Sequence, residues 1–216
     1  TGNAVKNMML KAAPAVLAML LLAGCFEDRP SDNVAEPVIR KQAETDLENG
    51  LKIVDLQRSN GQVDPDSANR YKVTYDYRLQ LTKPYAEVVL AIATRWHTQW
   101  KEEAANPSPS FMGIAAMQTT MEHAQYGMLA EEWINAQGDG FDARRDNFVG
   151  NCAPCRVFWD AEDAPDEAEL RRTAYILGWR HLEDKQFEDA FQVGDGVERQ
   201  ARSYFEKTEK GWVPSN

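Results

Sequence analysis

Residues 71–81, YKVTYDYRLQL, alternate strictly between apolar and polar side chains. The apolar set is Tyr71, Val73, Tyr75, Tyr77, Leu79 and Leu81. Successive side chains of a β-strand point to opposite faces of the sheet, so this pattern predicts a long strand with one buried and one solvated face. Strands of parallel sheets are usually covered on both faces and lack the alternation. The sheet is therefore expected to be antiparallel.

Further strands are expected on either side of this one. A strand at Leu51–Gln57 is predicted to precede it, separated from it by a turn-rich stretch of residues 58–69. Near the end of the chain, residues 197–207 predict a strand that turns at Thr208–Gly211 into a short last segment with Trp212.

Helices are expected at the start and in the middle of the chain. The first spans residues 37–49, because Pro37 suits a first helical turn and Gly50 suits a helix end. Residues 138–155 lack a period, and residues 156–160 are expected to form a short strand. Three longer helices are predicted at Tyr85–Ala104 (whose first half could instead extend the sheet), Phe111–Gln137 and Pro165–Asp184. The expected fold class is α+β, an antiparallel sheet with an N-terminal helix and a large helical middle segment.

The first 24 residues have the layout of an export signal. They carry Lys6 and Lys11, no acidic residue, and an apolar run over residues 12–22. Eleven residues rise only about 16 Å as a helix, half of the roughly 30 Å hydrocarbon core of a bilayer. A spanning helix is therefore not expected from this run, which ends in the four residues Leu22-Ala23-Gly24-Cys25.

These four residues resemble the lipobox of bacterial lipoproteins. The resemblance implies a diacylglyceryl group on the Cys25 thiol and cleavage before Cys25, which several acyl chains would then anchor stably to a membrane. It implies a signal peptide at residues 1–24, a tether at 25–36 and a single periplasmic domain at 37–216. Phe26, directly after the cysteine, is typical of lipoproteins of this family that are sorted to the outer membrane. The inner membrane is the alternative location. An ordinary cysteine at the end of a core helix is the other interpretation.

The opening helix and the closing antiparallel pair also resemble small periplasmic lipoproteins with cystatin-like or NTF2-like folds. That resemblance implies a curved antiparallel sheet wrapped around a helix. Residues 85–190 would then be a large insertion into such a fold.

The charge of the chain disfavours nucleic acid as a partner. The formal net charge is −10, and loss of the two lysines in residues 1–24 would make it −12. Such a surface repels phosphate backbones, and the chain has no cluster of basic and aromatic residues. The expected partners are a membrane, through the lipid anchor, and a protein of the cell envelope.

Cys152 and Cys155 form the motif Cys-Ala-Pro-Cys. It resembles the core of thioredoxin-like oxidoreductases, which implies Cys152 as the attacking thiol and Cys155 as the resolving one. No apolar strand precedes the motif, and Pro165 leaves no room for a long helix after it. A disulfide that staples an irregular segment is the first expectation in an oxidising compartment, with a redox role as the alternative. Two thiolates alone supply half of a structural zinc site.

Other clusters of polar or sulfur-containing residues indicate a metal site or a catalytic site less specifically than the Cys-Ala-Pro-Cys motif indicates a disulfide. Met117, Met121 and Met128 share one helical stripe, which predicts core packing, with copper as the alternative. Three aspartates lie close together but do not match a calcium-loop pattern: Asp139, Asp142 and Asp146. His97 lies between Trp96 and Trp100 but far in sequence from His123 and His181, and no Ser-His-Asp or Cys-His set can be assembled around it. No cofactor, metal or assembled catalytic set is therefore expected.

Aromatic side chains are the remaining candidates for binding. Tyr75 and Tyr77 belong to the alternating strand, while Trp96 and Trp100 are one helical turn apart. Aromatic residues exposed in a groove commonly anchor interfaces, although most are expected to pack in the core. The sequence thus predicts a non-enzymatic, membrane-anchored periplasmic lipoprotein that binds a partner protein or small ligand, with a thiol-disulfide oxidoreductase as the alternative.

Overall fold

The computed structural model describes residues 28–45, 47–105 and 112–215, without the side chains of residues 112–120. The expected signal peptide and lipobox, with Cys25, lie outside the described residues. Within the described helices, none is both long and apolar enough to cross a membrane.

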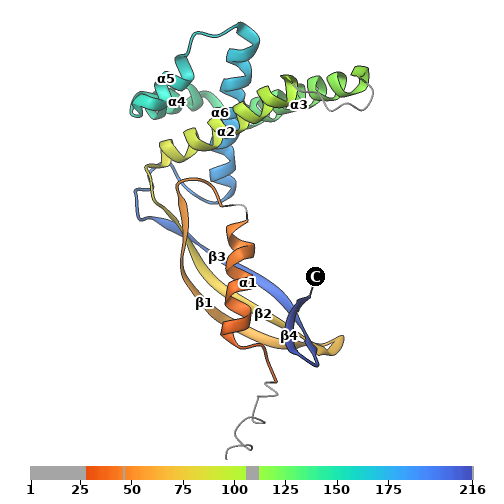
Figure 1. Cartoon of the computed structure of the whole chain (residues 1–216). Coiled ribbons are helices and arrows are strands. Elements are labelled where there is room, and N and C mark those ends of the chain that lie inside the picture. Colours follow the sequence, from red (N-terminus) through yellow and green to blue (C-terminus); the bar gives the residue numbers. More distant parts are fainter. Residues whose placement is uncertain (1–27, 46, 106–111, 216) are drawn as a thin grey trace, which may run out of the picture.

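The sheet has four antiparallel strands in the order β1-β2-β3-β4 (Figure 1). Their bounds are Leu51–Asp64, Ser67–Leu81, Gly196–Thr208 and Gly211–Ser215. In β2, the alternating side chains are buried as predicted at Val73, Tyr75 and Leu81. The strand expected to end at Gln57 instead continues to Asp64, because residues 58 and 60–63 pair with β2, with one shift in register between Arg58 and Asn60. The turn-rich composition of this stretch reflects its exposure at the end of a long hairpin.

Helix α1 lies across one face of the sheet. It spans Asp32–Glu44 and begins five residues before the predicted start at Pro37, so residues 32–36 of the expected tether are helical. The fully buried Ala35 and Ile39 pack into a core with the sheet, in which Phe205 of β3 is also fully buried. Burial of these side chains compensates for placing a proline, which lacks an N–H group, inside the helix.

Between β2 and β3, the chain forms the helical middle segment. Its long helices are α2 (Tyr85–Ala105), α3 (Met112–Gln137) and α6 (Pro165–Asp184). The alternative of a sheet extension after Tyr85 is therefore wrong. The stretch expected to be irregular forms a short 3-10 turn at Gly138–Gly140 and helix α4 at Phe141–Gly150, and the expected strand at 156–160 belongs to helix α5, Ala153–Asp160.

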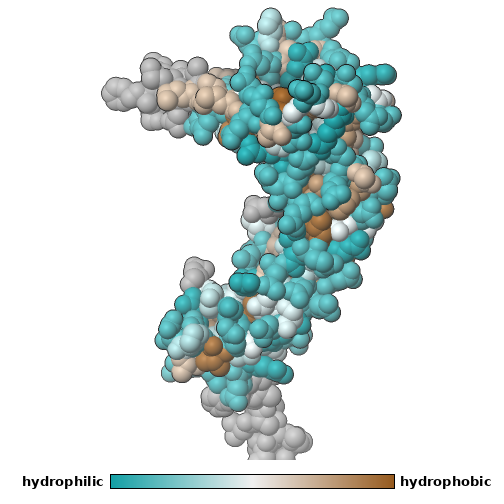
Figure 2. All heavy atoms as spheres, turned by 180° about the vertical axis from the view of Figure 1, so that it is seen from behind, coloured by the Kyte–Doolittle hydropathy of each residue, from teal (hydrophilic) through white to brown (hydrophobic). Residues whose placement is uncertain are grey.

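One continuous core joins the end of the sheet to the helices. Leu79 and Leu81 of β2 belong to the same buried cluster as Val89 and Ile92 of α2 and Trp179 of α6. The fold is α+β, as predicted. Figure 2 shows a mostly hydrophilic surface and a curved outline, hollowed on the side where the upper part projects over the lower part.

Candidate functional site

An aromatic groove lies where α2, α3 and α6 meet. It has a volume of about 420 Å³. Two of the predicted binding residues, Trp96 and Trp100, line it, and it is completed by Gln99, Tyr126, Leu129, Leu177, Arg180, His181 and Asp184. Trp96 and Trp100 point to the same side because residues four positions apart lie on one face of a helix.

The aromatic rings of the groove form a row in which each ring contacts the next. The centroids of Trp96 and Trp100 are 6.3 Å apart, and Trp100 stacks on Tyr126 of α3 at 4.6 Å. The rings of His181 and Trp96 form a T-shaped pair with their centroids 5.4 Å apart. Trp100 is buried, whereas Trp96 and Tyr126 are only half-buried. The groove therefore presents partly exposed aromatic surface held in place by a buried ring.

A buried carboxylate lies beside the aromatic groove. Glu48, in the segment before β1, has a side chain only 6% exposed, and the Arg95 guanidinium donates a 2.9 Å hydrogen bond to it. Nε2 of His181 lies 3.1 Å from Oε1 of Glu48. Burial alone would raise the pKa of Glu48, but the contacts with His181 and Arg95 outweigh burial and lower the pKa. Glu48 therefore holds α2 and α6 next to the sheet as an ionised group.

Charges of both signs stand at the mouth of the aromatic groove. Arg180 donates a 3.2 Å hydrogen bond to the carbonyl oxygen of Leu129, and its Nε lies 3.8 Å from Oδ2 of Asp184. Arg180 thus bridges α6 to α3 across the groove. An apolar floor with a charged rim is the usual anatomy of a protein-binding surface.

The other two aromatic candidates lie elsewhere. Tyr75 is buried under α1, where its hydroxyl donates a 2.7 Å hydrogen bond to Asp32. Burial and the Asp32 carboxylate raise the pKa of Tyr75, which is thus a neutral structural donor. Tyr77 lines a separate hollow of about 440 Å³ between the end of α1 and the edge of β3. The structure therefore places Trp96 and Trp100 together in the aromatic groove, Tyr75 in the core under α1 and Tyr77 in a second hollow.

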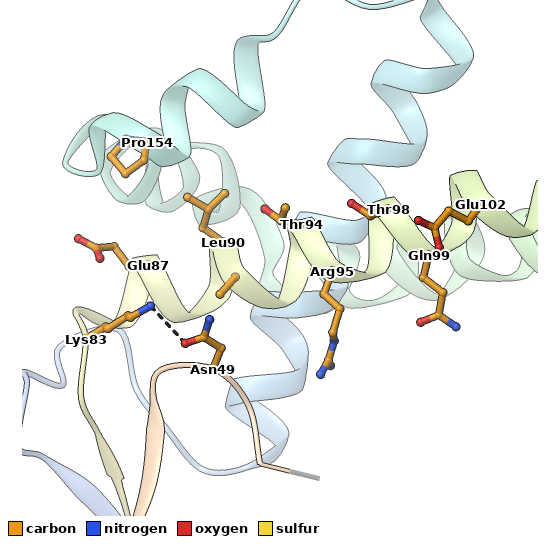
Figure 3. A pocket seen from close by; sticks show the side chains of 11 residues that line it. Asn49, Lys83, Glu87, Leu90, Thr94, Arg95, Thr98, Gln99, Glu102 and Pro154 are labelled. Atoms are coloured by element: carbon orange, nitrogen blue, oxygen red, sulfur yellow. Dashed lines mark hydrogen bonds between the residues drawn. The ribbon is translucent and has the colours of Figure 1, made fainter.

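A larger polar groove of about 690 Å³ follows the outer face of α2. Figure 3 shows Thr94, Thr98 and Gln99 along this helix and Pro154 at the far end. At its base, the Lys83 ammonium donates a 3.2 Å hydrogen bond to Asn49. In the described part of the chain no aromatic residue lines this groove, so there it lacks the aromatic anchors that the aromatic groove provides.

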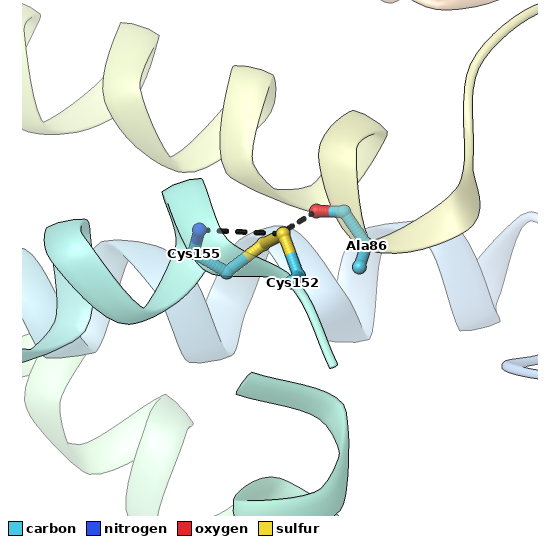
Figure 4. The surroundings of a disulfide bond; sticks show 3 residues. All are labelled: Ala86, Cys152 and Cys155. Atoms are coloured by element: carbon cyan, nitrogen blue, oxygen red, sulfur yellow. Dashed lines mark hydrogen bonds between the residues drawn. A yellow bond between two sulfur atoms is a disulfide. The ribbon is translucent and has the colours of Figure 1, made fainter. Parts of the chain in front are cut away.

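Cys152 and Cys155 form a disulfide next to α2 (Figure 4). Cys152 is 8% exposed and Cys155 fully buried. Sγ of Cys152 accepts a hydrogen bond from the Cys155 N–H at the start of α5, and Sγ of Cys155 lies 3.4 Å from the carbonyl oxygen of Ala86. A sulfur at a helix start agrees with the redox interpretation, whereas the burial favours a structural disulfide that closes the first turn of α5 where it packs against α2, because exchange needs an accessible sulfur. The redox role stays a prediction.

The methionine stripe does not pack in the core. Met121 is 67% exposed and Met128 is 64% exposed, so the expected core packing is wrong for both. The side chain of Met117 lies outside the described residues. The core face of α3 is instead formed by residues such as Ala130 and Trp133, on the opposite side of the helix.

The remaining candidate ligands do not assemble either. Asp142 and Asp146 both pair with Arg145. His97 faces the ring of Phe158, and burial together with Lys101 lowers its pKa. In the described ranges of the chain, no three His, Cys, Asp or Glu side chains converge where a metal ion could be held.

Several polar residues of the groove region were missed by sequence reasoning. Glu48, Arg180 and His181 stand in segments that are ordinary amphipathic helix or turn, and nothing in their spacing indicates that they meet. Arg144 is similar: it pairs with both Asp189 and Glu183, and its guanidinium lies 4.5 Å from the ring centroid of Trp179. No local pattern could have found these long-range contacts.

Comparisons of the chain with protein-family models, with curated proteins and with solved structures found no match.

Proposed function

We propose that this chain is a lipid-anchored, non-enzymatic protein of the bacterial cell envelope that binds a partner protein in the aromatic groove. The lipobox-like residues ending at Cys25 support the anchor, and the acidic composition disfavours nucleic acid as a partner. Phe26 supports the periplasmic face of the outer membrane, with the inner membrane as the alternative.

The observation that carries the binding proposal is the partly exposed aromatic surface of the groove. Trp96 and Tyr126 offer large ring faces that lose little conformational entropy on binding, and the buried Trp100 holds them in place. The groove is bordered by Arg180 and Asp184, which pair weakly with each other at 3.8 Å and are available to polar groups of a partner. An apolar side chain of the partner would lie on Trp96, and its neighbouring polar groups would meet this rim.

A protein partner agrees better with this arrangement than a small molecule does. Small-molecule sites usually enclose most of the ligand surface. Here three helices form an open floor, and both charges at the rim belong to the exposed side of α6.

The proposal can be tested by site-specific photo-crosslinking in cells. A photoreactive residue replaces Gln99 in the groove, and the control places it at Lys210, an exposed position at the hairpin between β3 and β4. We expect one reproducible envelope protein to be captured from Gln99 and not from Lys210. The adduct should be lost on Trp96→Ala and on Arg180→Glu, the second change being outside the buried core. Equal capture from both positions, or none from Gln99, would contradict the proposal.

The anchor has a separate test. In cells, Cys25→Ser should move the protein from the membrane fraction to the soluble periplasmic fraction, because no acyl chain would be attached. A Cys25→Ser protein that remains in the membrane fraction would refute lipid anchoring while leaving the groove proposal intact.

A further inference from the structure

The two edges of the sheet differ in regularity. The ladder of the edge strand β1 is interrupted by register shifts, and Asp55 in one of them has a φ of 55°. Such bulges protect an edge from pairing with another strand. β3 instead pairs with β2 without a shift from Gly196 to Glu206. β3, the strand next to the short edge strand β4, is therefore the more regular one.

Only part of β3 is covered on its outer side. β4 pairs with residues 204–208, at the end of the sheet away from the helical middle segment (Figure 1). Residues 196–203, called here the free half of β3, have no strand on the side away from β2 in the described part of the chain. Eight residues of strand present about 26 Å of edge at about 3.3 Å per residue. The free half of β3 is thus long enough to receive an extended segment.

The hollow that contains Tyr77 borders the free half of β3 and extends over the α1 side of the sheet to Tyr77 and Leu79 of β2. Four consecutive residues of β3, 199–202, line it, together with Lys185 at the end of α6. Among the residues that the structure describes, its lining contains three cationic residues, Lys185, Arg199 and Arg202, and no carboxylate, in a chain whose net charge is −10. The residues that line the hollow thus carry three positive charges, while the exposed Glu198 of the same strand lies outside this lining.

These cations contact neutral oxygens in the described residues. Arg199 donates to the side-chain oxygen of Gln186 and to the carbonyl oxygen of Lys185. Arg202 donates to the side-chain oxygen of Gln200 at 2.6 and 3.0 Å. None of the three cations forms an ion pair with a described residue. Other arginines of the chain, such as Arg144 and Arg145, pair with carboxylates.

We infer that the free half of β3 binds an acidic, extended segment of another protein, which adds to the sheet as a further strand. Backbone hydrogen bonds along the edge supply affinity, and carboxylates of the segment pair with Lys185, Arg199 and Arg202. A second copy of this chain is disfavoured as the occupant, because pairing two such edges would bring the same cations together. The inference concerns a different surface from the aromatic groove and does not depend on it.

The test selects ligands without assuming a sequence. A library of random displayed peptides is selected on the full chain in detergent, and the best peptides are synthesised and measured by fluorescence anisotropy. We expect enrichment of Asp and Glu and binding at low salt that weakens at least tenfold in the double variant Lys185→Glu/Arg202→Glu. The matched control is Lys52→Glu/Lys210→Glu, the same charge change at two exposed positions outside the lining of the hollow. It should leave the affinity within twofold of the unmodified chain.

Backbone pairing is tested on the same peptides. N-methylation of alternate amides should abolish binding in one register and spare it in the other, because only every second N–H of an added strand faces β3. Four results would each overturn the inference. The selection could yield no peptides, or peptides without enrichment of acidic residues. The charge reversals could have the same effect as the control, or binding could be insensitive to N-methylation. A dimer formed through this edge, detected by sedimentation, would overturn it as well.

Discussion

Replacing Glu48 tests how the sheet is held to the helical segment. Its side chain is 6% exposed and lies next to Arg95 of α2 and His181 of α6. Hydrogen bonds to charged groups contribute about 1.5–3 kcal/mol each. Arg95 is 53% exposed and solvent screens the pair, so the contribution is discounted. Glu48→Gln is expected to lower the free energy of unfolding by about 1–2 kcal/mol at pH 7, as measured by urea denaturation.

The effect should depend on pH in a defined direction. The pKa of Glu48 is lowered in the folded chain from its ordinary value of 4.5. Its charge therefore stabilises the fold fully above pH 4.5, and this contribution is lost as the pH falls through the folded pKa. The difference between Glu48→Gln and the unmodified chain should shrink from pH 7 to pH 3.

The control for this experiment is Glu44→Gln, an exposed position near the end of α1. It should change the free energy of unfolding by less than about 0.5 kcal/mol at either pH. A Glu48→Gln effect no larger than that of the control, or one that grows as the pH falls, would refute the role assigned to the buried carboxylate.

Two glycines and the disulfide yield further expectations, all measured by urea denaturation. Gly127→Ala in α3 should stabilise by about 0.5–1 kcal/mol, since the added methyl meets no atom within 4 Å. Gly196→Ala should destabilise by more than about 1 kcal/mol, since its Cβ would lie 2.4 Å from the Leu79 carbonyl oxygen; equal effects at the two sites would contradict this. Replacing Cys152 and Cys155 by alanine should cost about 2 kcal/mol by the loop-closure model. A bond reduced at a glutathione-like potential of about −220 mV, with mixed disulfides trapped by Cys155→Ser, would instead support the redox role.

Local patterns predicted the elements whose side chains follow a clear period or carry terminal signals. The alternation from Tyr71 to Leu81 corresponds to the buried face of β2, and the predicted helix Pro165–Asp184 has the same bounds as α6. The prediction for residues 138–160 was wrong because the short helices there have weak local signals. Tertiary burial of Phe141, Val149 and Cys155 stabilises them instead.

The candidate site was predictable only in part. Trp96 and Trp100 could be paired from sequence because they are one helical turn apart, and both line the aromatic groove. Tyr126 and His181 come from other helices, so only the packing of α3 and α6 on α2 brings them there. Tyr75 shares the period of Tyr77 but is covered by α1, an outcome that depends on where a separate helix docks.

The sequence by itself determined the antiparallel strand pattern, the long helices and the lipobox-like motif, because each depends on neighbours a few residues apart, and the acidic charge balance, because it follows from composition alone. Only the tertiary structure decided which aromatic residues share a groove, which carboxylate is buried at Glu48, and which half of β3 lacks a strand partner among the described residues. These features depend on contacts between residues far apart in the chain. Their geometry is set by the packing of helices against a sheet, which no local period encodes.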